Sequence, residues 1–353
     1  QASQPICNLQ FSRFAGCCDE FSAFTTEHHN TTTTMISNTL RRAFTTTTSS
    51  AKVGFIGLGN MGGHMANNLL AAGKEVVLYD IFADPVDRLV SAHPNAASAA
   101  ATPKELASSC DTIITMLPSN PHVKSTYMDG ETGLLAGVNA GTLFIDSSTI
   151  DPAVSREVAA ACEAVSTSFV DAPVSGGVGG AEAGTLTFMV GGADADFAKA
   201  DDVLSIMGGN IVHCGGVGTG EVAKLCNNLV LGISMAGVCE AMKLGENLGI
   251  DTKVLAGIMN TSTARCWSSD TYNPCPGVMD GVPSSNGYQG GFGSALMQKD
   301  LGLALDASRA NGVPAPMGAT AFQLYSMMMA HGAGGKDFSA LFEFLEGTHT
   351  KNL

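Results

Sequence analysis

The glycine-rich stretch from Ala51 to Leu70, "AKVGFIGLGNMGGHMANNLL", constrains the fold more than any other part of the chain. Its G-x-G-x-x-G spacing also arises by chance, so it carries weight only between a strand and a helix. The run "KVGFI" predicts that strand, and "GHMANNLLAAG" predicts a helix that stops at Gly73. A second predicted strand, "EVVLY", is followed by Asp80, the acid that a nucleotide-binding motif requires.

Each glycine of this motif has a physical role. Gly57 permits a tight turn, Gly59 lets backbone N–H groups approach a pyrophosphate, and Gly62 lets the helix pack on the strand. The phosphates then lie at the positive end of the helix dipole. The Asp80 carboxylate accepts hydrogen bonds from ribose hydroxyls and repels a 2′-phosphate, so the motif favours NAD over NADP. The alternative is a glycine-rich turn that binds no nucleotide.

Further apolar segments alternate with helical stretches after this unit. "CDTIITMLP", "GTLFIDSST" and "SFVDAPVSGG" are typical of buried strands, and such alternation predicts a parallel sheet. Ligands of such sheets bind at the carboxyl ends of the strands. Leu117-Pro118 and Ser148-Thr149 follow strands directly, so we expect them to line the cofactor cleft. Turns that merely end the strands would use the same residues.

The second half of the chain has a helical pattern. The segment from Glu221 to Gly249 predicts one long helix, apolar around most of its circumference and therefore buried. Lys224 and Asn228 lie four residues apart on one face of it. Burial lowers the pKa of a lysine and makes it a usable general acid or base. A lysine whose amine reaches solvent is the equally weighted alternative.

A second glycine-rich stretch, "DAPVSGGVGG", leaves the predicted strand before it. Successive N–H groups of Gly176 and Gly177, together with the Ser175 hydroxyl, can form a nest for an anion such as a substrate carboxylate. A surface loop without a ligand is the alternative interpretation.

Length and charge limit the function classes. A chain of 353 residues is long enough for two domains. Its net charge of −14 argues against nucleic acid and membrane surfaces as partners. The apolar stretch Leu229–Cys239 is too short to span a bilayer. Ten cysteines without C-x-x-C pairs indicate reduced thiols inside a cell, and no metal site is expected.

Residues 1–50 differ in composition from the rest and are interpreted as a disordered leader. Within them, "MISNTLRRAFTTTTSS" starts at Met35 and contains two arginines, many hydroxyls and no acid. That composition fits a mitochondrial presequence, and Met35 is a candidate initiator. A disordered cytosolic tail is the alternative.

Four blocks together resemble the β-hydroxyacid dehydrogenase family over roughly Lys52 to Leu345: "GFIGLGNMG", "DAPVSGG", "GTGEVAKLCNN" and "MQKDLGLALD". The resemblance implies a Rossmann dinucleotide-binding domain over residues 51–217. It also implies an all-α domain over residues 218–348 for substrate binding and oligomerisation. Lys224 resembles the catalytic acid/base of the family. Substrate binding is assigned to Ser175, Gly176, Gly177 and Asn228. Cofactor binding is assigned to Gly57, Leu58, Gly59, Asn60, Met61, Gly62, Asp80, Leu117, Pro118, Thr149 and Lys299.

The activity implied by the resemblance is NAD-dependent oxidation of a small hydroxy acid. The run that begins "RCWSSDTYNPCPG" narrows the implied substrate to 3-hydroxyisobutyrate. The implied product is methylmalonate semialdehyde, a step of valine breakdown in the mitochondrial matrix. Alternatives are a tartronate semialdehyde or glyoxylate reductase on the same scaffold, and a non-catalytic NAD-binding protein. The family also implies a homodimer or homotetramer. A further cofactor contact falls on either Asn120 or His122.

Overall fold

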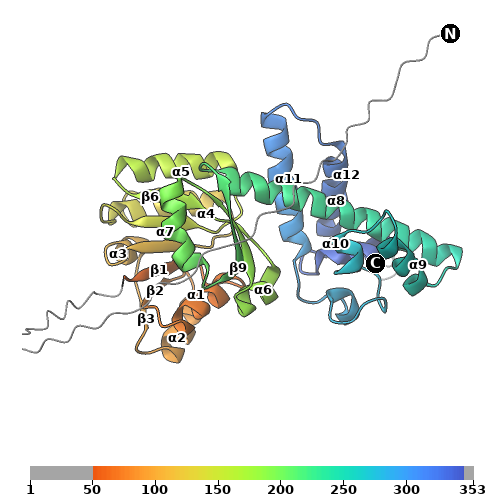
Figure 1. The fold of residues 1–353 in the computed structure, drawn as a ribbon, viewed down its shortest axis with the longest axis horizontal. Helices are drawn as coiled ribbons and strands as arrows, with labels where there is room; N and C mark the ends of the chain where they lie inside the picture. The colour runs from red at the N-terminus through yellow and green to blue at the C-terminus, as the bar shows by residue number, and fades with distance from the viewer. Residues whose placement is uncertain (1–50, 346–353) are drawn as a thin grey trace, which may run out of the picture. The chain divides into compact units, whose positions relative to one another are not determined.

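The computed structural model describes residues 51–345 of the chain. The predicted leader, residues 1–50, lies outside the described residues, as do positions 346–348 of the predicted helical domain. Among the described residues, a nine-stranded sheet with helices on both faces is followed by a helical region (Figure 1). The predicted α/β fold, a Rossmann domain followed by a helical domain, is therefore confirmed.

The sheet consists of short strands, most of them rich in buried apolar residues. They are β1 Val53–Ile56, β2 Val76–Tyr79, β3 Ala97–Ala99, β4 Thr112–Thr115, β5 Leu143–Asp146, β6 Ser168–Asp171, β7 Val174–Ser175, β8 Leu186–Gly191 and β9 Gly208–Gly215. Their order is β3-β2-β1-β4-β5-β6-β8-β7, and β9 pairs with β8. The order reverses between β1 and β4, so the loops after these strands border the crevice where such sheets bind ligands.

Helices cover both faces of the sheet because neighbouring strand residues point to opposite sides. One face, which carries Phe55 and Leu78, is covered by α1 Gly62–Ala71, α2 Ala83–Ala92, α6 Gly177–Ala183 and α7 Asp194–Leu204. On the other, with Ile56 and Val77, pack α3 Pro103–Ala107, α4 Asn120–Met128 and α5 Pro152–Ala164, along with the 3-10 turn η1 Leu134–Ala136. Two apolar layers therefore enclose the sheet.

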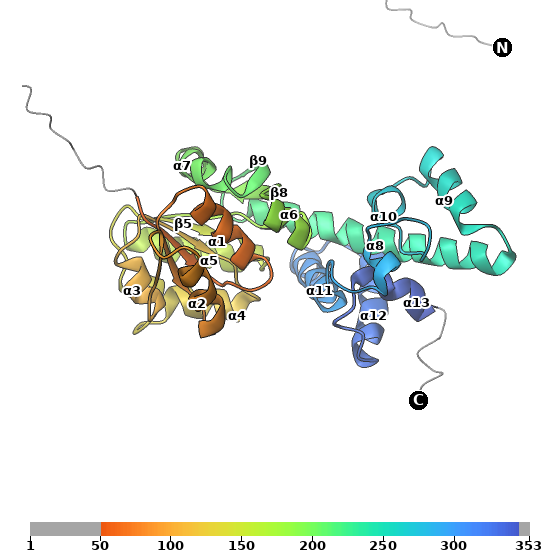
Figure 2. The same cartoon turned by 90° about the horizontal axis from the view of Figure 1, so that it is seen from below.

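The predicted long helix is confirmed as α8, Thr219–Leu248. It ends at Gly249, whose φ of +87° is a left-handed conformation that favours glycine. Figures 1 and 2 both show α8 as one uninterrupted helix. The elements that follow are α9 Thr252–Thr261, α10 Trp267–Asp270, η2 Pro283–Asn286, α11 Ser294–Ala310, α12 Pro316–Ala330, η3 Phe338–Ala340 and α13 Leu341–Leu345. They enclose a second core around Met235, Cys239 and Met242 of α8.

The expectation that α8 is buried around its circumference is only partly met. Val230 and Leu248 are 65% and 78% exposed. By length and composition alone α8 could cross a membrane, since an 18-residue window has a mean hydropathy of 1.5. The prediction from sequence considered only the shorter run 229–239. In the described structure α8 begins against the sheet and packs on α11, α12 and α13, as the core helix of a folded protein does.

Two details of the sheet differ from the expectation. "SFVDAPVSGG" forms two strands, β6 and β7, because Pro173 between them lacks the N–H that a ladder needs. The sheet is also not wholly parallel, since β8 runs antiparallel to both β6 and β7. The seven cysteines among the described residues are all free thiols.

Candidate functional site

The loop between β1 and α1 forms a bare backbone cradle. Gly57 has φ +92°, and a methyl group on it would overlap the carbonyl oxygen of Met116, at the end of β4. A methyl group on Gly62 would overlap the carbonyl oxygen of Gly57. Around Gly59, by contrast, no atom lies within 4 Å of the position that a Cβ would take. With no side chain capping α1, the cradle fits a dinucleotide pyrophosphate.

Asp80 holds this cradle from the end of β2. Its Oδ2 accepts a hydrogen bond from the Leu58 N–H at 2.6 Å, and its Oδ1 accepts one from the Phe82 N–H at 2.9 Å. The two residues that follow Asp80, Ile81 and Phe82, are 76% and 68% exposed. They bring no positive charge that could pair with a 2′-phosphate, so this edge suits the free ribose hydroxyls of NAD.

Asp146, the last residue of β5, organises the loops after β4 and β5. Its Oδ1 accepts hydrogen bonds from the hydroxyls of Thr115 at 2.7 Å and Ser148 at 2.5 Å. The Ser148 Oγ in turn accepts the Leu117 N–H at 2.8 Å. Burial raises the pKa of Asp146, against the lowering effect of these hydrogen bonds. Sequence reasoning missed Asp146, although an acid that ends the apolar run "LFID" is a readable signal.

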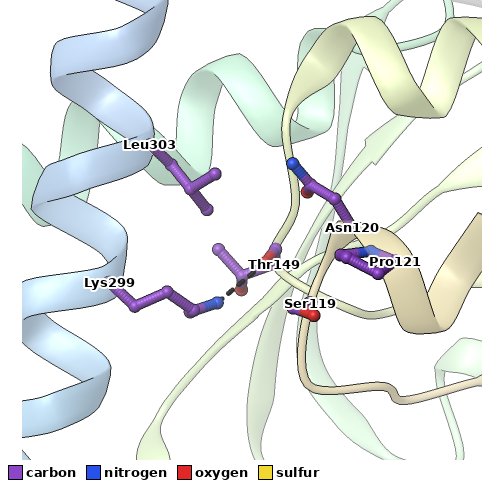
Figure 3. A pocket seen from close by; sticks show the side chains of 6 residues that line it. All are labelled: Ser119, Asn120, Pro121, Thr149, Lys299 and Leu303. Carbon is purple, nitrogen blue, oxygen red and sulfur yellow. Dashed lines mark hydrogen bonds between the residues drawn. The ribbon is translucent and has the colours of Figure 1, made fainter.

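A pocket of about 100 Å³ lies where these loops meet α11. Its lining residues are Ser119, Asn120, Pro121, Thr149, Lys299 and Leu303. Figure 3 shows Lys299 and Leu303 extending from one helix toward Thr149, with Ser119, Asn120 and Pro121 on the other side. The Lys299 Nζ donates a hydrogen bond to the Thr149 carbonyl oxygen at 2.8 Å. Thr149 and Lys299, 150 residues apart, are thus in direct contact.

Asn120 and His122 differ in their relation to this pocket. Asn120 lines it, and its Oδ1 accepts the Asp151 N–H at 3.0 Å. His122 is exposed, and its Nδ1 lies 2.7 Å from the Ser119 Oγ. Of the two alternatives, Asn120 is therefore the one that lines the pocket.

Lys224 and Asn228 are both buried on one face of α8, with exposed fractions of 7% and 1%. Desolvation lowers the pKa of Lys224, an effect that Asp300 and Glu221 oppose. The Asn228 Nδ2 donates to the Asp300 Oδ2 at 2.6 Å, and the Asp300 Oδ1 lies 3.1 Å from the Lys299 Nζ. The contacts Asn228–Asp300–Lys299–Thr149 therefore join this face of α8 to the pocket. Asp300 follows Lys299 directly in sequence, but nothing in the sequence pattern indicates its partner.

The first turn of α8 is held to the sheet half by one carboxylate and one backbone N–H group of that half. Asp171, at the end of β6, accepts the N–H of Gly218 at 2.6 Å and of Glu221 at 2.9 Å. Burial raises the pKa of Asp171 to about 6. Glu221 is itself fully buried, and its Oε2 accepts the Ile150 N–H at 3.3 Å. Like Asp146, Asp171 ends an apolar strand, and both acids were missed from sequence.

The Ser175 strip, residues 175–177, joins β7 to α6 through backbone that favours glycine. Gly176 and Gly177 have φ values of +137° and +63°. The helix that follows, α6, is tied to α1, because the Asn68 Nδ2 donates to the Ala181 carbonyl oxygen at 2.8 Å. Among the interactions recorded for residues 51–345, none joins Ser175 to Lys224. The predicted site residues thus fall into three groups: the cradle, the Lys224 network and this strip.

Comparison with family models divides the chain at the start of α8. Residues 52–216 match the NAD binding domain of 6-phosphogluconate dehydrogenase. Residues 218–345 match the model described as NAD-binding of NADP-dependent 3-hydroxyisobutyrate dehydrogenase. Within 51–345, no group of three or more His, Cys, Asp or Glu side chains could hold a metal ion.

Curated relatives and solved structures give the same family. A probable mitochondrial 3-hydroxyisobutyrate dehydrogenase of Dictyostelium discoideum is 56% identical over 84% of this chain and 91% of its own length. The mitochondrial 3-hydroxyisobutyrate dehydrogenase of Homo sapiens is 54% identical over 84% and 88%. The structure of the Mycobacterium tuberculosis 3-hydroxyisobutyrate dehydrogenase with L-serine has a TM-score of 0.79 at 41% identity, covering 84% of this chain and 99% of that one.

Proposed function

The chain belongs to the 3-hydroxyisobutyrate dehydrogenase family, and from that membership we propose that it oxidises 3-hydroxyisobutyrate to methylmalonate semialdehyde with NAD, using Lys224 as general acid/base. The observation that carries the proposal is a buried lysine on the face of α8 that Asn228, Asp300 and Lys299 link to the Thr149 pocket. A tartronate semialdehyde reductase and a non-catalytic NAD-binding protein are not favoured by these relatives.

The chemical step requires a base that is neutral near physiological pH. Desolvation lowers the pKa of Lys224, so a larger fraction of its amine is neutral than in water. The neutral amine takes the hydroxyl proton of the substrate as the carbonyl forms. In reduction, the ammonium form returns that proton. Oxidation should therefore speed up as the pH rises through the pKa of Lys224, whereas reduction should slow down.

Other residues hold the reactants. We assign the carboxylate of the substrate to the Ser175 hydroxyl and the N–H groups of Gly176 and Gly177, whose positive φ values suit an anion nest. Asn228, with its amide held by Asp300, is assigned to the substrate hydroxyl beside Lys224.

The cofactor fits the loops at the carboxyl edge of the sheet. NAD, when bound, supplies the nicotinamide carbon that accepts the hydride. The loop from Gly57 to Gly62 would hold the pyrophosphate, with contributions from Leu58, Asn60 and Met61. Asp80 would bind the adenosine ribose, and Leu117-Pro118, Thr149 and Lys299 would line the nicotinamide side.

The base role is tested by Lys224→Met, which keeps the aliphatic stem and removes the amine. We expect kcat to fall by a factor of at least about 10², with the affinity for NAD, measured by calorimetry, unchanged. The matched control is Lys253→Met, at an exposed lysine on α9. Near-normal turnover of the Lys224 variant would remove it from the base role.

We further propose that the protein is a homodimer or homotetramer in the mitochondrial matrix. Exposed apolar side chains on α8 and α9, including Val230, Leu248 and Val254, support burial against a second copy. The relatives named mitochondrial and the composition of residues 35–50 support the location. We assign residues 51–217 to cofactor binding and residues 218–348 to substrate binding and subunit contact. Light scattering in solution measures the number of subunits.

A further inference from the structure

Glu221 is a buried acid that the reaction described above does not use. It lies three residues before Lys224 on α8, a spacing that brings two side chains to the same side of a helix. Its exposed fraction is 0%. One carboxylate oxygen, Oε2, accepts the Ile150 N–H at a long 3.3 Å. The other, Oε1, is buried and has no hydrogen-bond partner in the described structure. Such an oxygen is costly unless a charge or proton compensates it.

The other acids of this region already have hydrogen-bond donors. Asp171 accepts two N–H groups at the start of α8, and Asp146 accepts two hydroxyls between β4 and β5. Asp300 accepts the Asn228 amide and lies 3.1 Å from the Lys299 ammonium. Glu221, Asp146 and Asp300 each have one buried carboxylate oxygen without a hydrogen-bond partner in the described structure. Of these acids only Glu221 lies on α8, one turn from Lys224.

Proton transfer to Lys224 creates a charge in a place that disfavours it. When the amine takes the substrate proton, the O–H bond breaks, an N–H bond forms, and a buried ammonium results. A nearby carboxylate compensates that charge, whereas a neutral group does not. Asp300, and after it Glu221, exert this effect, because the charge of each raises the pKa of Lys224.

We propose that Glu221 is a positioning residue for the reaction, whose carboxylate is, together with that of Asp300, a counter-charge that holds the ammonium form of Lys224. The inference rests on the proposed role of Lys224 as acid/base. Glu221 neither gains nor loses a proton in the step, and no contact with substrate or cofactor is assigned to it. It raises the pKa of Lys224, and it therefore shifts the pH range in which oxidation and reduction run.

The other charges around Glu221 shift its pKa in opposite directions. Burial, then Asp146 from β5 and Asp171 from β6, raise the pKa of Glu221 well above its usual range, whereas Lys299 from α11 lowers it. A cation on Lys224 acts in the same sense as Lys299 and favours the carboxylate. Arg156 of α5 packs against Gly218 at the start of the same helix. Lys299 and a charged Lys224 therefore both stabilise the carboxylate form of Glu221.

The test is Glu221→Gln in the full chain. The amide keeps the shape and an oxygen that can accept the Ile150 N–H, so only the charge is lost. Glu221→Asp keeps the charge and shortens the side chain. The matched control is Glu240→Gln, at an exposed glutamate on the same helix. Thermal unfolding verifies that each variant is folded.

Two readouts follow the protonation of Lys224. The first is trace labelling of the cofactor-free protein with acetic anhydride across a pH series, with the acetylated Lys224 peptide measured by mass spectrometry. Labelling follows the neutral amine, and exposed Lys199 serves as the internal reference. The second is the pH profile of kcat in both directions. A purely structural role of Glu221 would change the amplitudes and leave the midpoints in place.

We expect Glu221→Gln to move the Lys224 labelling midpoint down by about 1 pH unit. The acid limb of oxidation and the alkaline limb of reduction should move down with it, while Glu221→Asp retains a midpoint above that of the glutamine variant. Midpoints that coincide in wild type and Glu221→Gln would overturn the proposal, even with Lys224→Met inactive. An active Lys224→Met variant would instead refute the acid/base role itself, so the two failures are distinguishable.

Discussion

Replacing glycines of the β1–α1 loop by alanine should affect stability at Gly62 and NAD binding at Gly59. At Gly62 the added methyl group overlaps the Gly57 carbonyl oxygen and lies 3.0 Å from its carbon, so α1 must move away from β1. Such overpacking costs about 1–3 kcal/mol in the free energy of unfolding. At Gly59 the methyl group meets no atom within 4 Å, so stability should stay within about 0.5 kcal/mol of wild type.

The affinity for NAD, unlike stability, should be sensitive to the change at Gly59. The methyl group of Gly59→Ala occupies the space that a pyrophosphate needs for close approach to the backbone. We expect the Kd for NAD to rise at least tenfold, which is about 1.4 kcal/mol, in a protein that melts normally. Gly237→Ala, also in open space but on α8, is the control and should bind NAD as wild type does.

Calorimetric titration with NAD and thermal unfolding measure the two quantities on the same samples. Wild-type affinity in Gly59→Ala would mean that the pyrophosphate does not approach this loop. A wild-type melting temperature in Gly62→Ala would mean that helix and loop have room to separate, contrary to the contact seen here.

Three further predictions concern carboxylates. Asp80→Ala should weaken NAD more than NADP, because it removes the acceptor for the ribose hydroxyls and the repulsion of a 2′-phosphate; an unchanged ratio of the two Kd values would contradict this. Asp300→Asn should lower kcat/KM at least about tenfold, since it removes the partner of Lys299 and a charge beside Lys224; steady-state kinetics measure it. Burial raises the Asp171 pKa from 3.8 to about 6, so its stabilisation is present at low pH and is lost as the pH rises through that range. Relative to Asp171→Asn, the wild type should lose about 3 kcal/mol between pH 3 and 7, as measured by unfolding at both values.

Local patterns allowed the overall fold to be predicted. The strand, glycine loop and helix from Val53 to Ala71 lie within one short segment, so their signals are adjacent in the sequence. The end of α8 was predictable because Gly249 takes a left-handed conformation that other residues avoid. The division of "SFVDAPVSGG" was also readable from Pro173, which cannot join a ladder. The expectation of a single strand in this segment ignored that signal.

The partners of the buried acids could not be assigned from the sequence, because they come from distant elements. Asn228 and Asp300 are 72 residues apart, and Asp171 and Glu221 are 50 apart. An aspartate in a helix is usually solvated, and nothing in the block "MQKDLG" says that Asp300 is 2% exposed. Long-range burial of this kind is decided by packing, which periodicity alone does not encode.

The contacts that hold the first turn of α8 limit how halves of related enzymes can be exchanged. The two family models meet at the start of this helix, yet Asp171 and Ile150 reach across that boundary to Gly218 and Glu221. A chimaera joined at residue 217 would combine the sheet of one parent with the lysine turn of another. Its buried acids would then face a helix with which they did not evolve. A chimaera joined after Leu225 keeps Lys224, Glu221 and Asp171 from a single parent, whereas Asn228 and Asp300 come with the exchanged helical half.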